Sequence, residues 1–151
     1  MWSGIAAWHT RSIQQARRYG QVVSPIGRVR RLPDINSYNA RLVGWSERSA
    51  VNSPVQGFAS DLMQLAAAWI GGFALGHAPV WDAEIVATVH DSIVIEAPAD
   101  RWEPVVRECM RRMVNVGELL PVLDCHLDVP LAVEAKVGTR WGLADIGTVE
   151  S

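Results

Sequence analysis

The sequence is poor in cysteine and lacks any apolar run long enough to cross a membrane. Cys109 and Cys125 are too few and too oddly spaced for a disulfide framework or a zinc site, so a reducing, cytoplasmic setting is the default expectation. The most apolar stretch, residues 62–75, is shorter than a membrane span and carries Gln64. Residues 1–8 lack a basic segment followed by an apolar core, so they predict no signal peptide.

Lysine is nearly absent as well, and most of the basic charge is arginine concentrated near the start of the chain. Residues 1–48 carry eight arginines against Asp34 and Glu47, a local charge of +6. Residues 49–151 carry six basic and fourteen acidic groups, a local charge of −8. A basic first third suits contact with phosphates, and an acidic remainder suits metal or packing chemistry. Arginines that are only solvated on helix faces are the alternative.

The chain does have the apolar content of a folded domain. It has 151 residues, of which 49% are hydrophobic, which is enough to bury a real core. Helical and strand patterns do not alternate as βαβ units would, so the expected fold class is α+β. In the first half we expect a helix over residues 5–19 that is closed by Gly20, followed by a hairpin of residues 21–24 and 28–32 that turns at Pro25 and Gly27. A loop over 33–37 then leads to a long helix over 39–75, which should be kinked or broken at Pro54 and closed by residues 76–79.

The second half predicts a hairpin, a helix and a strand. The elements expected there are a hairpin over residues 84–97, an amphipathic helix over 101–118, a strand over 129–137, and a loose tail after Trp141.

The most informative stretch is residues 85–98, in which two β-branched runs flank His90, Asp91 and Ser92. The pattern predicts a strand, a tight turn and a strand that hold the Asp91 carboxylate at the tip of a rigid hairpin. Such a carboxylate suits a divalent cation, because Mg²⁺ prefers hard oxygen ligands. A single Asp cannot hold the two metals that phosphoryl transfer to a hydroxyl requires. An Asp that only caps its own turn is the alternative reading.

A polar stripe lies on the long predicted helix. Arg48, Asn52 and Gln56 are spaced i, i+4 and i+8, so they share one face. One guanidinium and two amides supply the donors that suit the minor-groove acceptors shared by all base pairs. A solvated helix face is the alternative.

An arginine cluster follows a glycine at the predicted hairpin turn. Gly27 precedes Arg28, Arg30 and Arg31, which suit contacts with backbone phosphates. Strand alternation should place Arg28 and Arg30 on one face and Arg31 on the other. An arginine-rich edge strand that prevents aggregation is the alternative.

Taken together, the order and spacing of these segments resemble the C-terminal palm of family A DNA polymerases, the bacterial polymerase-I type. The resemblance covers about residues 8–145. The residues that carry it are Tyr19-Gly20, Gly27-Arg28-x-Arg30-Arg31-x-Pro33-Asp34, Glu47-Arg48, Asn52-x-Pro54-x-Gln56-Gly57-x-Ala59-x-Asp61, Val89-His90-Asp91-Ser92, Glu96-Ala97-Pro98, Val129-Pro130-Leu131, Gly138 and Trp141.

The resemblance implies a palm fragment, with an antiparallel sheet packed on long helices, from a DNA-directed DNA polymerase. Such an enzyme adds a nucleotide from a dNTP to a primer 3′-hydroxyl on template DNA and uses Mg²⁺. Asp91 would be a catalytic metal ligand, and His90 would lie by the primer terminus. The residues that would face DNA are Arg48, Asn52 and Gln56 at the minor groove and template, and Arg28, Arg30 and Arg31 near the backbone.

The chain departs from the family pattern in two ways. Ser92 stands where the family usually has Glu, and a hydroxyl is a poorer metal ligand. The first family motif, Asp-Tyr-Ser-Gln-x-Glu, and the fingers helix that grips the triphosphate are absent from these residues. We therefore expect the chain to be inactive alone and to need a companion polypeptide or chain segment, in a bacterial cell or a phage-infected host. A non-catalytic DNA-binding or assembly remnant of a polymerase is the alternative.

Overall fold

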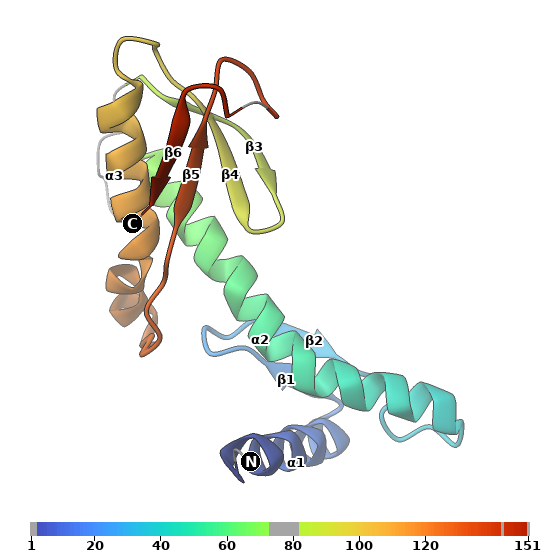
Figure 1. Cartoon of the computed structure of the whole chain (residues 1–151). Coiled ribbons are helices and arrows are strands. Elements are labelled where there is room, and N and C mark those ends of the chain that lie inside the picture. Colours follow the sequence, from blue (N-terminus) through green and yellow to red (C-terminus); the bar gives the residue numbers. More distant parts are fainter. Residues whose placement is uncertain (1–2, 73–81, 143, 151) are drawn as a thin grey trace. The chain divides into compact units, whose positions relative to one another are not determined.

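A computed structural model describes residues 3–72, 82–142 and 144–150 (Figure 1). The chain forms two compact units, Met1–Ala59 and Ser60–Ser151, and each is described by itself. Within the described residues, three α-helices accompany antiparallel strands that pair as three separate two-stranded sheets. The predicted α+β class is therefore confirmed.

The first unit opens with helix α1, Ser3–Tyr19, close to the predicted span of 5–19. Gly20 ends it as predicted: its φ is +68°, a left-handed conformation that glycine adopts without strain, and its N–H donates to the Ala16 carbonyl at 2.8 Å. Strands β1, Gln21–Val23, and β2, Val29–Arg31, then form the predicted hairpin, although both are shorter than expected.

Helix α2, Ala40–Ile70, begins in the first unit and ends in the second. Asn39 caps its start, because the Asn39 Oδ1 atom accepts from the Arg41 N–H at 3.0 Å. The helix continues through Pro54, so of the predicted kink or break the break is wrong and the kink stays a prediction. Proline removes one N–H donor, which a 31-residue helix tolerates. The helix ends at Ile70 rather than residue 75, and the expected closing residues 76–79 lie outside the described part.

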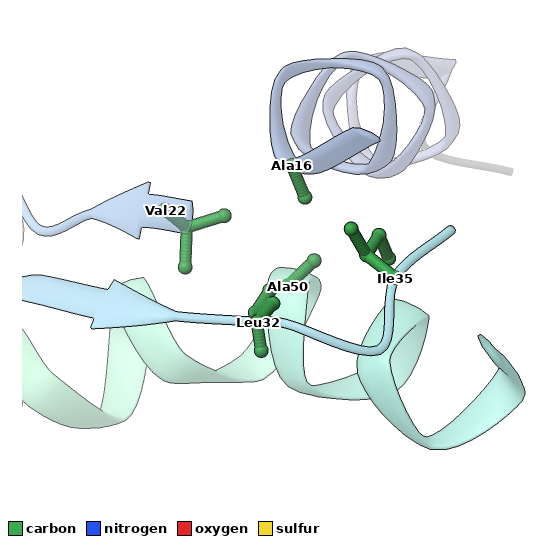
Figure 2. Close-up of a cluster of buried hydrophobic side chains, with 5 residues drawn as sticks. All are labelled: Ala16, Val22, Leu32, Ile35 and Ala50. Atoms are coloured by element: carbon green, nitrogen blue, oxygen red, sulfur yellow. The ribbon is translucent and has the colours of Figure 1, made fainter. Parts of the chain in front are cut away.

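The core of the first unit is a small cluster of buried side chains, Ala16, Val22, Leu32, Ile35 and Ala50 (Figure 2). Figure 2 shows Ala16 on α1 and Ala50 on α2 both directed toward the space between the two helices, where Ile35 also lies. Alanines at these two positions keep the packed side chains small, so both helices can cover the hairpin and its following loop closely.

Polar contacts at the edge of this core also join α1 to the elements that follow it. The Arg17 guanidinium contacts the Glu47 carboxylate of α2 at 2.6 Å. The Asn36 side-chain amide donates to the Arg17 carbonyl at 2.8 Å, which satisfies an acceptor at the end of α1.

The second unit packs a hairpin against helices. Strands β3, Glu84–Val89, and β4, Ser92–Glu96, form the predicted hairpin, followed by α3, Trp102–Val114. Ile85, Ile93 and Ile95 of the hairpin pack on Ile70, Val105 and Cys109. A second cluster joins Ala66, Trp69, Val116 and Leu119.

Both cysteines are free and buried, and burial raises the pKa of the Cys109 thiol to about 11.

Three predicted features of the second unit are wrong in detail. The helix over 101–118 ends at Val114, and a 3₁₀-helix, η1, Val116–Leu123, replaces its last turn. The last strand, β5, is only Glu134–Val137. The tail is not loose, because β6, Gly147–Glu150, pairs antiparallel with β5. Asp145 closes that connection, accepting from the Thr139 N–H and hydroxyl at 2.8 and 2.7 Å.

Within the described ranges, no helix is both long and apolar enough to span a membrane.

A charged network fixes α3 to the end of α2. The Glu108 carboxylate contacts Arg111 Nε at 2.7 Å and Arg112 Nε at 2.9 Å. The Arg112 guanidinium also donates to the Trp69 carbonyl in the last turn of α2, where carbonyls lack helical partners. Hydrogen bonds from Arg111 and Arg112 lower the pKa of Glu108 from 4.5 to about 2, although partial burial opposes this shift.

Replacing Glu108 should therefore make stability respond differently to pH. The pKa of Glu108 is lower in the folded chain than in the unfolded chain, so the ionised carboxylate makes its full contribution to the free energy of unfolding above about pH 4.5. That contribution is lost as pH falls toward 2. We expect Glu108→Gln to lower the free energy of unfolding near pH 7 by about 2 kcal/mol. The difference from the parent chain should shrink between pH 4.5 and 2, as measured by urea unfolding at several pH values. Glu103→Gln, which removes the exposed pair with Arg107, is the matched control and should cost about 0.5 kcal/mol or less.

Ser46 offers a second stability test. It is fully buried in the first unit, and its hydroxyl has no hydrogen-bond partner among the residues that the structure describes. Because an unsatisfied buried hydroxyl is costly, Ser46→Ala should raise the free energy of unfolding by about 1 kcal/mol. Ser49→Ala makes the same change on the same helix at a partly exposed site, and so isolates the effect of burial from helix propensity. An equal gain in both variants would contradict the prediction.

Candidate functional site

The Asp91 carboxylate lies at the tip of the β3–β4 hairpin. Val89 pairs with Ser92, so His90 and Asp91 form a two-residue turn, and both are exposed. Ser92 therefore begins β4 rather than extending the turn, which the sequence pattern did not distinguish. β-Branched residues such as Ile85 and Ile93 build the strands and pack on the core, so the turn projects from a supported hairpin.

The backbone at this turn adopts an uncommon conformation. His90 has a φ of +55°, in the left-handed region that non-glycine residues rarely occupy. The Ser92 hydroxyl donates to the Val89 carbonyl at 2.8 Å across the turn. Two-residue hairpin turns require a positive φ at a central position, so the tight hairpin accounts for this conformation and the role of Asp91 stays a prediction.

The donors around Asp91 fit only part of a metal site. A carboxylate on a supported turn is a suitable hard ligand for a divalent cation. No group of three or more His, Cys, Asp or Glu side chains that could hold a metal ion occurs among the described residues. The described residues thus fit one ligand position at Asp91, and a complete cation site would need carboxylates from elsewhere.

Two arginines of the first unit, Arg28 and Arg30, line a pocket of about 380 Å³. Arg28, Arg30 and Gln56 share this lining, so the structure brings together residues from the hairpin and from α2. Arg31 does not belong to the described lining. The three consecutive residues Arg28, Val29 and Arg30 all do, so the lining does not test the predicted alternation, which stays a prediction. The complete described lining is Val22, Ser24, Arg28, Val29, Arg30, Ser53, Pro54, Gln56 and Gly57.

The predicted stripe on α2 is only partly associated with this pocket. Arg48, Asn52 and Gln56 are all exposed, as a functional stripe requires. Only Gln56 lines the pocket. The Arg48 guanidinium instead lies along the helix toward Gly44, with Nη1 3.6 Å from where a Cβ on Gly44 would be.

Sequence reasoning missed three polar or small residues of the pocket. Ser24 and Ser53 contribute to the lining, and the Ser24 hydroxyl accepts from the Arg28 N–H at 3.1 Å. Gly57 leaves room for Arg28, because a Cβ there would lie 3.6 Å from the Arg28 Cδ atom. The position of Gly57 directly after Gln56 was a usable signal, since glycine permits close approach. Asp61, the last residue of the sequence motif that begins at Asn52, is buried and belongs to the second unit.

Known proteins show the same combination of segments. The model of DNA polymerase family A matches residues 1–143. DNA polymerase I of Pseudomonas aeruginosa is 35% identical over 142 residues, covering 91% of this chain and 14% of that protein. The DNA polymerase of Bacillus phage SP01 is 32% identical over 150 residues, covering 97% of this chain and 16% of that protein.

A solved structure gives the same picture at the level of the fold. The POL domain of Pol1 from M. smegmatis, in complex with a DNA primer-template and dNTP, matches with a TM-score of 0.64 and 26% identity. The match covers 76% of this chain and 20% of that one. The chain spans only 14 to 16% of the length of the two curated relatives named above.

Proposed function

The chain belongs to DNA polymerase family A, and we propose that it forms the C-terminal part of the palm of a DNA-directed DNA polymerase. The complete enzyme would add a nucleotide from a dNTP to a primer 3′-hydroxyl, directed by a template strand, with release of pyrophosphate. The observation that carries this proposal is the exposed Asp91 carboxylate on a two-residue turn, within a family match that covers most of the chain.

In this proposal Asp91 holds one ligand position for Mg²⁺, which the family uses. Bound divalent cations would activate the primer hydroxyl and neutralise the leaving pyrophosphate. The role of this chain is to fix Asp91 where the cation is shared with a second acidic ligand from elsewhere. His90, next to Asp91 in the same turn, would lie by the primer terminus.

The pocket of the first unit would contact primer-template DNA. Arg28 and Arg30 suit backbone phosphates, whereas Gln56 carries a neutral amide that suits minor-groove acceptors. Arg31, Arg48 and Asn52 would add contacts outside the pocket. A relative with this fold is known in complex with a DNA primer-template and dNTP, which supports the same partners for this chain.

Activity would depend on residues that the 151 residues do not include. They lack the Asp-Tyr-Ser-Gln-x-Glu motif and the fingers helix, and Asp91 is one carboxylate where a two-metal site needs more. We infer that a companion polypeptide or chain segment supplies both, in the cytoplasm of a bacterial cell or a phage-infected host.

A chimera tests this proposal directly. When this chain replaces the segment that it matches in DNA polymerase I of Pseudomonas aeruginosa, the product should extend a primer with Mg²⁺ and dNTPs. Asp91→Asn in the chimera should lower the extension rate by about a hundredfold or more, because a cation ligand is lost. DNA binding by the variant, measured by fluorescence anisotropy, should remain.

Asp128→Asn, which removes an exposed carboxylate of the second unit, is the matched control and should leave extension unchanged. The isolated chain should give no extension, and any extension by it would refute the need for a companion. A chimera that binds primer-template DNA but never extends it would favour the alternative of a non-catalytic remnant.

Salt dependence separates charged contacts from neutral ones in the same pocket. Arg28→Gln and Arg30→Gln in the chimera should each reduce the slope of log affinity against log salt by about 1, because each arginine releases a counterion from DNA. Gln56→Leu should weaken binding without changing that slope. Arg140→Gln, an exposed arginine of the second unit, is the control. Equal slopes for all four variants would remove the pocket from the DNA interface.

A further inference from the structure

The strand-end residue Ser92 makes a contact that the proposed reaction does not require. Its hydroxyl donates to the Val89 carbonyl at 2.8 Å. Val89 and Ser92 form the last register pair of the hairpin, so this bond joins the two ends of the turn that carries His90 and Asp91.

The turn needs such a bond more than most two-residue turns do. Tight hairpin turns usually place glycine or asparagine where φ is positive, whereas this one places His90 at a φ of +55°. A side chain with a Cβ loses free energy in that conformation, so the surrounding structure must hold it there. The exposed turn makes no contact with the core clusters that could do so, and the Ser92–Val89 bond is the side-chain contact across it among the described residues.

The chemistry of Ser92 makes it a poor ligand in its own right. A neutral hydroxyl is a weak ligand for a hard divalent cation compared with a carboxylate. The bond to Val89 uses the proton of this hydroxyl and fixes the orientation of the side chain, while the oxygen lone pairs stay free. Because the hydroxyl is a weak ligand, we expect its main effect on a cation to come through the position of Asp91.

We propose that Ser92 is a positioning residue that closes the His90–Asp91 turn and holds the Asp91 carboxylate in its ligating orientation, without itself binding the cation. That this orientation is the one that ligates a cation rests on the proposed function. Hydrogen exchange on the 151-residue chain and Mn²⁺ binding to the chimera test the role of Ser92, and neither measurement depends on polymerase activity.

The first measurement is amide hydrogen exchange by NMR on the full chain. Ser92→Ala should speed exchange of the amides at residues 90–93 by about fivefold, because the turn loses one hydrogen bond. Ser92→Thr retains the hydroxyl and should exchange like the parent. Thr88→Ala removes an exposed hydroxyl from the same hairpin and is the matched control. Thermal unfolding of all variants should be nearly unchanged, which separates a local effect from loss of the fold.

The second measurement follows Mn²⁺ binding to the chimera, which supplies the remaining acidic ligands, through the EPR signal of free Mn²⁺. Asp91→Asn should weaken this binding most, and Ser92→Ala should raise the half-saturating Mn²⁺ concentration about threefold to fivefold, with recovery in Ser92→Thr. A change in both measurements with recovery by threonine supports the proposal.

Other outcomes overturn it. Unchanged exchange in Ser92→Ala shows that the hydroxyl does not hold the turn. Weaker Mn²⁺ binding with unchanged exchange shows that Ser92 is a ligand instead. Faster exchange with unchanged Mn²⁺ binding shows that the turn does not position Asp91. If the chimera fails to extend a primer while the exchange and Mn²⁺ results hold, the proposed function fails and the role of Ser92 remains.

Discussion

The burial of one helix, α2, in hydrophobic clusters of both units is the constraint on which the rest of this structure depends. Near its start, Ala50 packs with Ala16, Leu32 and Ile35 in the first unit. Near its end, Ala66, Trp69 and Ile70 contribute to the clusters of the second unit. A helix gains most of its stability from such packing, which explains why a segment containing Gly44, Pro54 and Gly57 remains helical throughout.

The same burial decides which side chains of α2 are available for function. Ser46 and Ala50 are buried four residues apart, so the face that they share is used for packing. Arg48, Asn52 and Gln56 lie on another face and stay exposed. Gly57, next to Gln56, gives Arg28 space against the helix. Packing and the pocket are thus two consequences of one helical pattern.

Local signals made much of the architecture predictable. The helix ending at Gly20 and the hairpin around Gly27 follow from spacing and turn residues within a few positions of one another. The hairpin turning at Asp91 follows from two β-branched runs around a short polar segment. Features that need a distant partner were not predictable. The tail forms β6 because β5 pairs with it and because Asp145 closes the connection, and neither fact is written in the short polar sequence of 147–150. The helix continues through Pro54 for the same reason, since the propensity of one residue is weaker than packing over the whole length.

The sequence by itself determined the fold class, the family resemblance and the identity of the chemistry-bearing side chains, because periodicity and motif spacing are properties of the chain alone. Only the tertiary structure decided which of those side chains share a surface. It placed Gln56 with Arg28 and Arg30, and turned Arg48 toward Gly44. It also engaged the Ser92 hydroxyl with Val89. Side-chain direction and pairing depend on backbone conformation and on neighbours far away in the sequence, so no local pattern specifies them.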